Sequence, residues 1–112
     1  MTFLQLQNRA GRWVAPDDLT FAAAADGADW FSVPGMGLSI VDQKQATAWP
    51  VTSASFIIMY RNPDNREQSQ AVLKFFDWAF RYGCKMSEEL DYVHLPDTLT
   101  KQIRERVWNQ IK

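Results

Sequence analysis

The chain has 112 residues, of which 46% are hydrophobic, 13% aromatic and 22% charged, and its formal net charge is −1. This hydrophobic content supports one packed core and argues against an intrinsically disordered chain. Twelve Lys and Arg residues balance thirteen Asp and Glu residues without forming a basic block, which excludes the electrostatic footprint of a nucleic-acid-binding or anionic-membrane-binding protein.

Targeting and redox signals are weak. Cys84 is the only cysteine, so no intramolecular disulfide can form and the redox compartment is not indicated. No apolar run approaches the roughly 18 residues of a membrane-spanning helix. Residues 1–7 have neither the basic region nor the apolar stretch of a signal peptide. As written, the chain is expected in the cytoplasm unless it is cut from a longer exported precursor.

Two short strands and a helix are predicted near the start of the chain. The alternating run 3–6 and the segment 12–14 indicate strands separated by a turn. Pro16 is expected at the first helical position, where its missing N–H costs no hydrogen bond. A run of alanines favours the helix, and Gly27 is its expected C-terminal cap.

Two further strands are predicted in the middle of the chain. Residues 38–41 follow a Gly- and Pro-rich loop and favour a strand. Residues 55–60 are almost continuously apolar and rich in strand-forming side chains, which is typical of a strand covered on both faces.

The second half of the chain predicts helices. The best of them runs from about Glu67 to Tyr82, where an apolar stripe recurs at helical spacing and Gly83 ends it. A short helix or turn is expected over 86–92, and a last helix begins at Pro96. That last helix carries one apolar face and places its charged residues elsewhere; the apolar face comprises Leu99, Ile103, Val107 and Ile111, and the charged set Lys101, Arg104, Glu105 and Arg106.

The predicted order of strands and helices places the chain in the α/β class. It combines a few strands of a mixed sheet with three main helices. A sheet of so few short strands, one of them predicted to be buried on both faces, is too small to stand alone. The pattern is therefore typical of part of a larger sheet.

No residue is assigned a catalytic, ligand-binding, cofactor-binding or metal-binding role, and neither an enzymatic activity nor a cofactor is expected. His94 has no partner among its neighbours, and Cys84 has no CxxC pattern or companion histidine. Adjacent carboxylates on a helix do not face a common point, so the acidic cluster is interpreted as a solvated face; it comprises Glu88, Glu89 and Asp91.

Binding of an oxyanion is the most specific function that these residues suggest, as an alternative to having no functional site. Helix N-termini attract anions, but here they carry acidic residues that would repel one. Three hydroxyls occur close together, at Thr52, Ser53 and Ser55, and could bind an oxyanion, but no arginine lies among them. Local bonding of these hydroxyls to the backbone is the simpler interpretation.

Several blocks of sequence resemble one family. Residues 48–57 read AWPVTSASFI, whereas bacterial phosphate-binding proteins, the periplasmic receptors of high-affinity phosphate ABC importers of the Pst type, typically read AWPITGATFI there. Further matching blocks occur in the family's order across nearly the whole chain, namely 6–11, 14–16, 21–25, 28–30, 72–79, 90–92 and 95–97. The chain is similar to the C-terminal portion of these proteins.

The resemblance implies the C-terminal part of a type II periplasmic-binding-protein fold, in which two α/β lobes close on phosphate. Residues 1–48 would then end the second lobe, 49–55 would cross between the lobes, and 56–112 would finish the first lobe. The family's phosphate contacts lie in segments upstream of those present here, so none is carried over. The chain alone is therefore expected not to bind phosphate.

The resemblance also implies partners and a location. The whole parent protein would be periplasmic, and it would capture inorganic phosphate and deliver it to the membrane subunits of an ABC importer. The chain by itself is expected to self-associate or to pair with an upstream fragment, because strand edges and apolar faces would lack partners. A stand-alone protein-interaction module, derived from a truncated solute-binding protein, is the alternative function.

Overall fold

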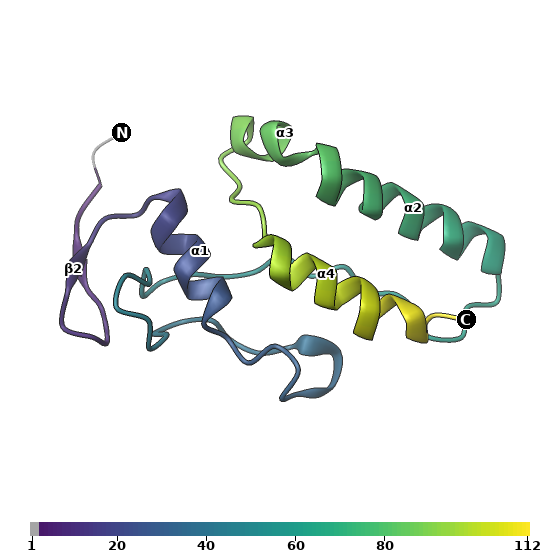
Figure 1. The fold of residues 1–112 in the computed structure, drawn as a ribbon, viewed down its shortest axis with the longest axis horizontal. Helices are drawn as coiled ribbons and strands as arrows, with labels where there is room; N and C mark the ends of the chain where they lie inside the picture. Colours follow the sequence, from purple (N-terminus) through teal and green to yellow (C-terminus); the bar gives the residue numbers. More distant parts are fainter. Residues whose placement is uncertain (1–2) are drawn as a thin grey trace. The chain divides into compact units, whose positions relative to one another are not determined.

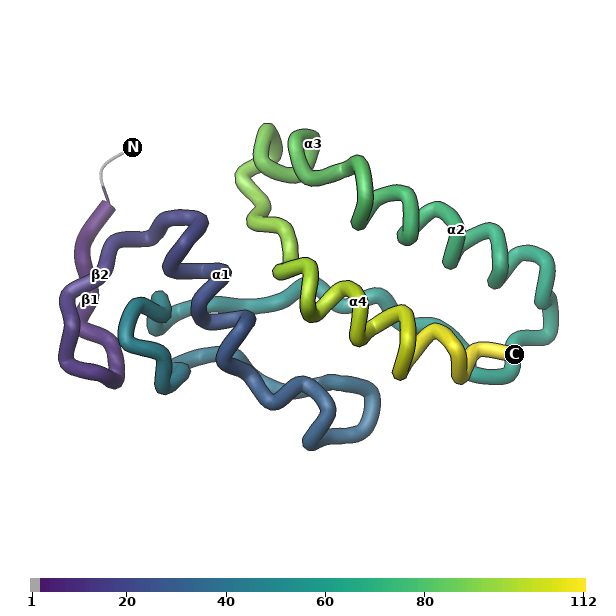
Figure 2. Tube along the Cα trace, viewed as in Figure 1, coloured from purple at the N-terminus to yellow at the C-terminus, as the bar shows by residue number. Residues whose placement is uncertain are grey.

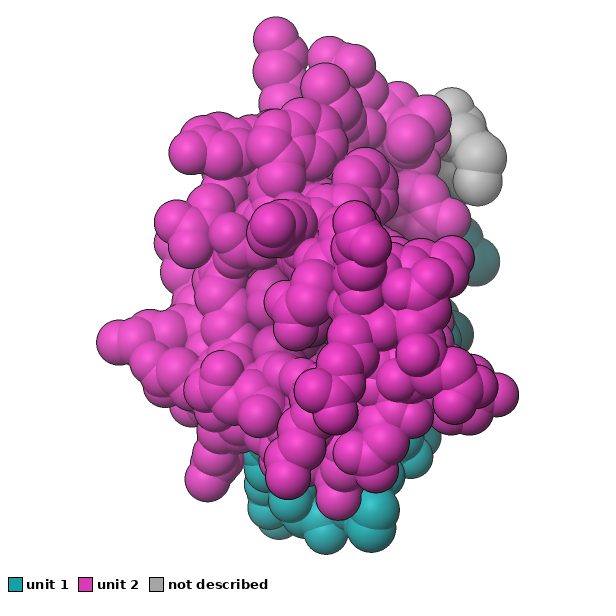
Figure 3. Space-filling view, turned by 90° about the vertical axis from the view of Figure 1, so that its right-hand side faces the viewer, with its two compact units in different colours: residues 1–55 teal, residues 56–112 magenta. Residues whose placement is uncertain are grey.

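The computed structural model describes residues 3–112 and divides into two compact units, residues 1–55 and residues 56–112 (Figure 3). In the described residues it has four α-helices and one two-stranded sheet, which is compatible with the α/β class (Figure 1). No described helix is long and apolar enough to cross a membrane.

The first unit begins with a small antiparallel hairpin. Strand β1 (Leu6–Gln7) pairs with β2 (Trp13–Val14), and Leu6 lies opposite Val14. Asn8 closes the turn, because its Oδ1 accepts hydrogen bonds from the backbone N–H groups of Ala10 and Arg12. Two short strands separated by a turn were predicted here. Strand β2 lies within the predicted segment 12–14, but β1 shares only Leu6 with the predicted segment 3–6.

Helix α1 (Asp18–Asp26) begins two residues after Pro16, which was expected at the first helical position. The reason is a capping box at Asp17. The Thr20 N–H donates to Asp17 Oδ1 at 2.9 Å, and the Asp17 N–H donates back to Thr20 Oγ1 at 3.1 Å. Gly27 caps the other end as predicted, and a Cβ there would overlap the Gln45 side chain.

Tryptophans organise the core of the first unit. Buried Trp30 donates from Nε1 to the Ala25 carbonyl at 2.7 Å, which satisfies its polar edge. Buried Trp49 donates its backbone N–H to the Thr20 carbonyl at 2.9 Å, and its ring lies 6.3 Å from that of Phe21. The remaining buried apolar residues of this unit are Val14, Ala24, Ala25, Ile40 and Ala48.

The predicted strand at 38–41 is wrong. The 3-10 helix η1 (Pro34–Met36) leads into this segment, and the Leu38 N–H donates to the Met36 carbonyl at 2.8 Å. Positive φ angles at Met36 (59°) and Asp42 (53°) turn the backbone at both ends. Ile40 is buried all the same, so its apolar character serves packing instead of strand pairing.

The second unit is helical, as the tube in Figure 2 shows. It contains α2 (Arg66–Tyr82), α3 (Cys84–Glu89), α4 (Asp97–Arg106) and the 3-10 helix η2 (Trp108–Gln110). Asn65 caps α2 by accepting the Gln68 N–H at 3.0 Å. Helix α2 thus starts within one residue of the prediction and ends before Gly83 as expected. Helix α3 starts two residues earlier than the expected helix or turn, at Cys84.

The core of the second unit is thin. Leu73 on α2 and Leu99 on α4 are its buried apolar side chains among the described residues. The predicted stripe of α2 is only partly covered, and Phe75 within it is 58% exposed. The apolar face predicted for the last helix extends past the end of α4 at Arg106. Ile103 lies on α4, whereas Val107 and Ile111 lie beyond it, and all three side chains are partly buried.

The predicted strand at 55–60 is also absent. Residues 52–60 form no helix or strand, and Ile58 is 94% exposed. A strand requires a neighbour to which its backbone can bond, and no described segment offers one here. The mixed sheet expected from the sequence is therefore not formed by residues 3–112.

Candidate functional site

The second unit has an open surface pocket of about 490 Å³. It opens between α2 on one side and the end of α4 with η2 on the other. Its lining mixes polar and apolar side chains, namely Gln70, Leu73, Lys74, Asp77, Arg104, Trp108, Asn109 and Ile111.

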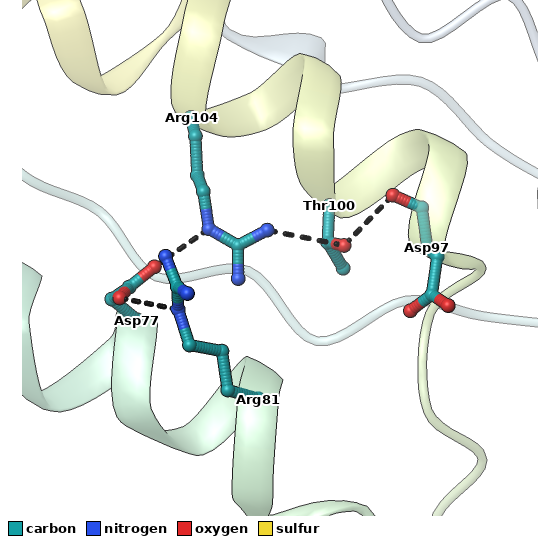
Figure 4. A network of polar contacts seen from close by, with 5 residues as sticks. All are labelled: Asp77, Arg81, Asp97, Thr100 and Arg104. Carbon is teal, nitrogen blue, oxygen red and sulfur yellow. Dashed lines mark hydrogen bonds and ion pairs between the residues drawn. The ribbon is translucent and has the colours of Figure 1, made fainter.

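An ion-pair network joins the two helices beside this pocket (Figure 4). Arg104 Nε on α4 donates to Asp77 Oδ1 on α2 at 2.6 Å, and Arg81 Nε donates to Asp77 Oδ2 at 2.8 Å. Arg104 Nη1 also reaches Thr100 Oγ1 at 3.5 Å, while that hydroxyl donates to the Asp97 carbonyl at 3.0 Å. Each carboxylate oxygen of Asp77 thus receives one guanidinium N–H.

Two aromatic rings hold the Arg104 guanidinium in place. Phe80 of α2 and Trp108 of η2 stack with their centroids 5.7 Å apart and an interplanar angle of 7°. The guanidinium carbon of Arg104 lies 5.9 Å from each ring centroid, and its side chain is only 26% exposed. The cation–π contacts with the two rings and the ion pair with Asp77 therefore position the same guanidinium group.

The charge on Asp77 follows from this arrangement. The hydrogen bond from Arg104 lowers the pKa of the Asp77 carboxyl, and Arg81 acts in the same direction. Partial desolvation opposes this effect and raises the pKa, but the hydrogen bond from Arg104 is the largest contribution. Asp77 is therefore ionised at neutral pH and neutralises part of the positive charge around it.

The charged side chains that line this pocket are better suited to joining two helices than to holding a free anion. Lys74 and Arg104 supply two cations at its wall, but Arg104 already bonds to Asp77. An incoming oxyanion would have to compete with a carboxylate that is fixed by two arginines. Arg104 was predicted to lie off the apolar face of the last helix, but its contact with Asp77 was not predicted. The i,i+4 spacing of Asp77 and Arg81 was the available local signal.

The three hydroxyls considered for oxyanion binding do not act as a unit. Thr52 is buried, and its Oγ1 donates to the Trp49 carbonyl at 3.0 Å, as the local-bonding interpretation predicts. Ser53 and Ser55 are exposed.

The remaining candidate residues lie apart from the pocket lining. His94 Nδ1 is 3.4 Å from Glu88 Oε1, and both side chains are about half exposed. Cys84 is a free, partly buried thiol at the start of α3. Within residues 3–112, no three His, Cys, Asp or Glu side chains form a cluster able to hold a metal ion.

The helix N-termini carry acids or caps of their own. Asp17 caps α1, Glu67 lies in the first turn of α2, and Asp97 lies in the first turn of α4. Each carboxylate takes the favourable end of the helix dipole and would repel a second anion there.

Comparison with known proteins gives a consistent result. No protein-family model matches the chain. A phosphate-binding protein PstS of Pasteurella multocida (strain Pm70) is 40% identical over 112 residues, which are 100% of this chain and 33% of that protein. The predicted resemblance to the bacterial phosphate-binding proteins is confirmed.

Two further relatives agree. The phosphate-binding protein PstS of Xylella fastidiosa (strain 9a5c) is 44% identical over 108 residues, covering 96% of this chain and 29% of that protein. The protein of the same description from Haemophilus influenzae is 38% identical over 112 residues, covering 100% of this chain and 34% of that protein. The chain thus spans about a third of the length of the curated phosphate-binding relatives it matches.

Proposed function

We propose that the chain is the C-terminal third of a phosphate-binding protein whose whole form captures inorganic phosphate for import by an ABC transporter. One observation carries the proposal: identity of 38–44% to three proteins described as phosphate-binding, along 96–100% of this chain. In that whole form the protein is periplasmic, is not an enzyme and passes phosphate to the importer's membrane subunits.

We further propose that this third alone does not hold phosphate. Tight capture of a dehydrated oxyanion needs several donors that converge on one point. The Arg104 guanidinium is bonded to Asp77, and the Thr52 hydroxyl is bonded to the Trp49 carbonyl. The donors for phosphate therefore come from the part of the protein that this chain does not span.

We also propose how this chain fits into the two lobes of the whole protein. Residues 1–48 end one lobe of a type II periplasmic-binding fold, 49–55 cross between the lobes, and 56–112 complete the other lobe. The thin core of the second unit supports this assignment, because its apolar residues exceed what its own helices cover. By itself the chain self-associates or pairs with an upstream fragment.

A stand-alone protein-interaction module is the second candidate. It is favoured by a row of exposed aromatic residues on one side of α2, formed by Phe75, Trp78 and Tyr82. The rings of Phe75 and Trp78 lie 6.1 Å apart and form one continuous apolar surface. Such a surface fits a protein partner as well as it fits the missing part of a larger fold.

A chimera separates the two candidates. The stretch of the Pasteurella multocida relative that matches this chain is replaced by this chain, and phosphate binding is measured by equilibrium dialysis. The first candidate predicts saturable binding by the chimera and none by the same relative with that stretch deleted. A chimera that melts cooperatively but does not bind phosphate would favour the interaction module.

A further inference from the structure

One face of helix α2 brings a line of polar side chains to the surface pocket of the second unit. Gln70, Lys74 and Asp77 are spaced at i, i+4 and i+7 along the helix, so they share one face, and all three line the pocket. Arg81 continues this face one turn further and pairs with Asp77. The polar face therefore lies next to the exposed aromatic row of α2 but is a separate surface.

The charges at this pocket are unbalanced. Its lining holds two cations, Lys74 and Arg104, and Arg81 adds a third beside it. Asp77 is the one carboxylate among the lining residues, and it accepts a hydrogen bond from each arginine (Figure 4). Three cations against one carboxylate leave a formal charge of +2, so the pocket favours a negatively charged occupant.

Lys74 is the cation that remains available for such an occupant. It is exposed, and its ammonium group has no ion-pair partner among residues 3–112. On α4, by contrast, Lys101 pairs with Glu105 at 4.0 Å. Because covering an unpaired ammonium group is costly, a protein that covers this face must bring a negative charge to it.

Apolar and amide groups surround these charges. Leu73, Trp108 and Ile111 line the pocket together with the side-chain amides of Gln70 and Asn109. Apolar side chains flanked by charged ones are typical of protein–protein contact surfaces. The volume of about 490 Å³ also lies in the range of sites that accept ligands of many atoms, which suits a segment of polypeptide better than a single small ion.

We propose that the pocket between α2 and the end of α4 with η2 is a docking surface for an acidic segment of a partner protein. A carboxylate of that segment would pair with the Lys74 ammonium group. Asp77 would stay in place between its two arginines, since Arg81 donates to it through Nε and keeps its Nη groups for a second acceptor. The proposed capture of phosphate gives this pocket no role, so docking here is a separate property of the chain.

Fluorescence anisotropy with a labelled peptide of glutamates spaced by leucines tests the docking. The 112-residue chain and the chimera should both bind it, and the same peptide with glutamine in place of glutamate should bind about tenfold more weakly. Added salt should weaken binding of the acidic peptide, because the charges are exposed. Equal binding of the two peptides would overturn the inference. Binding by the chain but not by a cooperatively melting chimera would also overturn it, since the rest of the protein would then cover the pocket.

Substitutions at Lys74 locate the site. Binding of the acidic peptide should weaken about threefold in Lys74→Gln and about tenfold in Lys74→Glu, and should stay within about twofold in Lys74→Arg. The matched control, Lys85→Glu, makes the same change of charge at an exposed lysine of α3 outside the pocket lining and should bind like the unchanged chain. Equal losses in Lys74→Glu and Lys85→Glu would mean general attraction between charges and would contradict a site at this pocket.

Sedimentation of the chain without peptide tests a second copy as the occupant. That copy could offer its own exposed acidic cluster to the pocket. Self-association that is absent, or that Lys74→Glu leaves unchanged, is the expected result. Salt-sensitive self-association that Lys74→Glu abolishes would assign the pocket to a second copy and would overturn the inference.

Discussion

Asp77 Oδ1 lies 2.6 Å from Arg104 Nε, and this contact ties helix α2 to helix α4 across 27 positions of sequence. The stacked pair of Phe80 and Trp108 lies beside it and connects the same parts of the chain. Because the second unit has few buried apolar residues, we expect this polar and aromatic connection to contribute to its stability.

Asp77→Asn should lower the stability of the chain at neutral pH, and the loss should shrink in acid. The hydrogen bond from Arg104 lowers the pKa of the Asp77 carboxyl below its ordinary value. A lowered pKa contributes stability that is present above the ordinary value and is lost as pH falls through the lowered one. Thermal melts by circular dichroism at pH 7 and pH 3 measure the difference. Glu105→Gln, in an exposed pair with Lys101, is the control. A stability gap between the wild-type and Asp77→Asn chains that is unchanged at pH 3 would contradict the account.

Asn8→Ala should destabilise the first unit by about 2–3 kcal/mol, since it would leave buried backbone groups without partners. The Asn8 Nδ2 group donates to the carbonyls of Ala46 and Ala48 at 2.9 and 3.1 Å, while its Oδ1 accepts two backbone N–H groups. Gln7→Ala removes an exposed hydrogen bond to the Gly11 carbonyl and should change stability by less than about 0.5 kcal/mol. Urea denaturation compares the two variants, and equal effects would show that the Asn8 contacts contribute little.

Leu73→Ala should cost more stability than Phe75→Ala, although phenylalanine is the larger side chain. Leu73 is buried, and its loss should cost about 2–3 kcal/mol, whereas Phe75 is largely exposed and should cost under about 1 kcal/mol. Denaturation midpoints of the 112-residue chain give the comparison. The reverse order would mean that α2 packs through its aromatic row, for example in a self-associated form.

Phosphate should not shift the melting temperature of the 112-residue chain. A ligand that binds only the folded state at 100 times its dissociation constant adds about 2.7 kcal/mol of stability. A melt in excess phosphate, compared with one in a matched chloride solution, detects such a shift. An upward shift specific to phosphate would reveal an anion site in this third of the protein.

The helices could be predicted from the sequence because their signals are local. Asn65 and Gly83 mark the ends of α2, and Gly27 marks the end of α1, each within a few residues of the backbone groups it caps. The start of α1 was predicted too early because Pro16 was taken as the first helical residue. The reciprocal hydrogen bonds of Asp17 and Thr20 instead make Asp17 the N-cap.

The strands at 38–41 and 55–60 were mispredicted because strand formation depends on a partner far away in sequence. The apolar character was interpreted correctly for Ile40, which is buried, but burial does not require a strand. For residues 57–60 the pattern indicates a strand, yet the described chain holds no neighbour for it. The contact of Asp77 with Arg104 was missed for the same reason, since its partners are 27 positions apart and no local spacing pairs them.

Calorimetric titration of phosphate into the chimera and into the 112-residue chain, side by side, tests whether the chain is part of a phosphate-binding protein and lacks the phosphate donors itself. We expect saturable heat of binding for the chimera and none for the chain alone. Binding by the chain alone would contradict the claim that the phosphate donors lie outside this third. No binding by a cooperatively folded chimera would contradict the claim that this chain is part of a phosphate-binding protein.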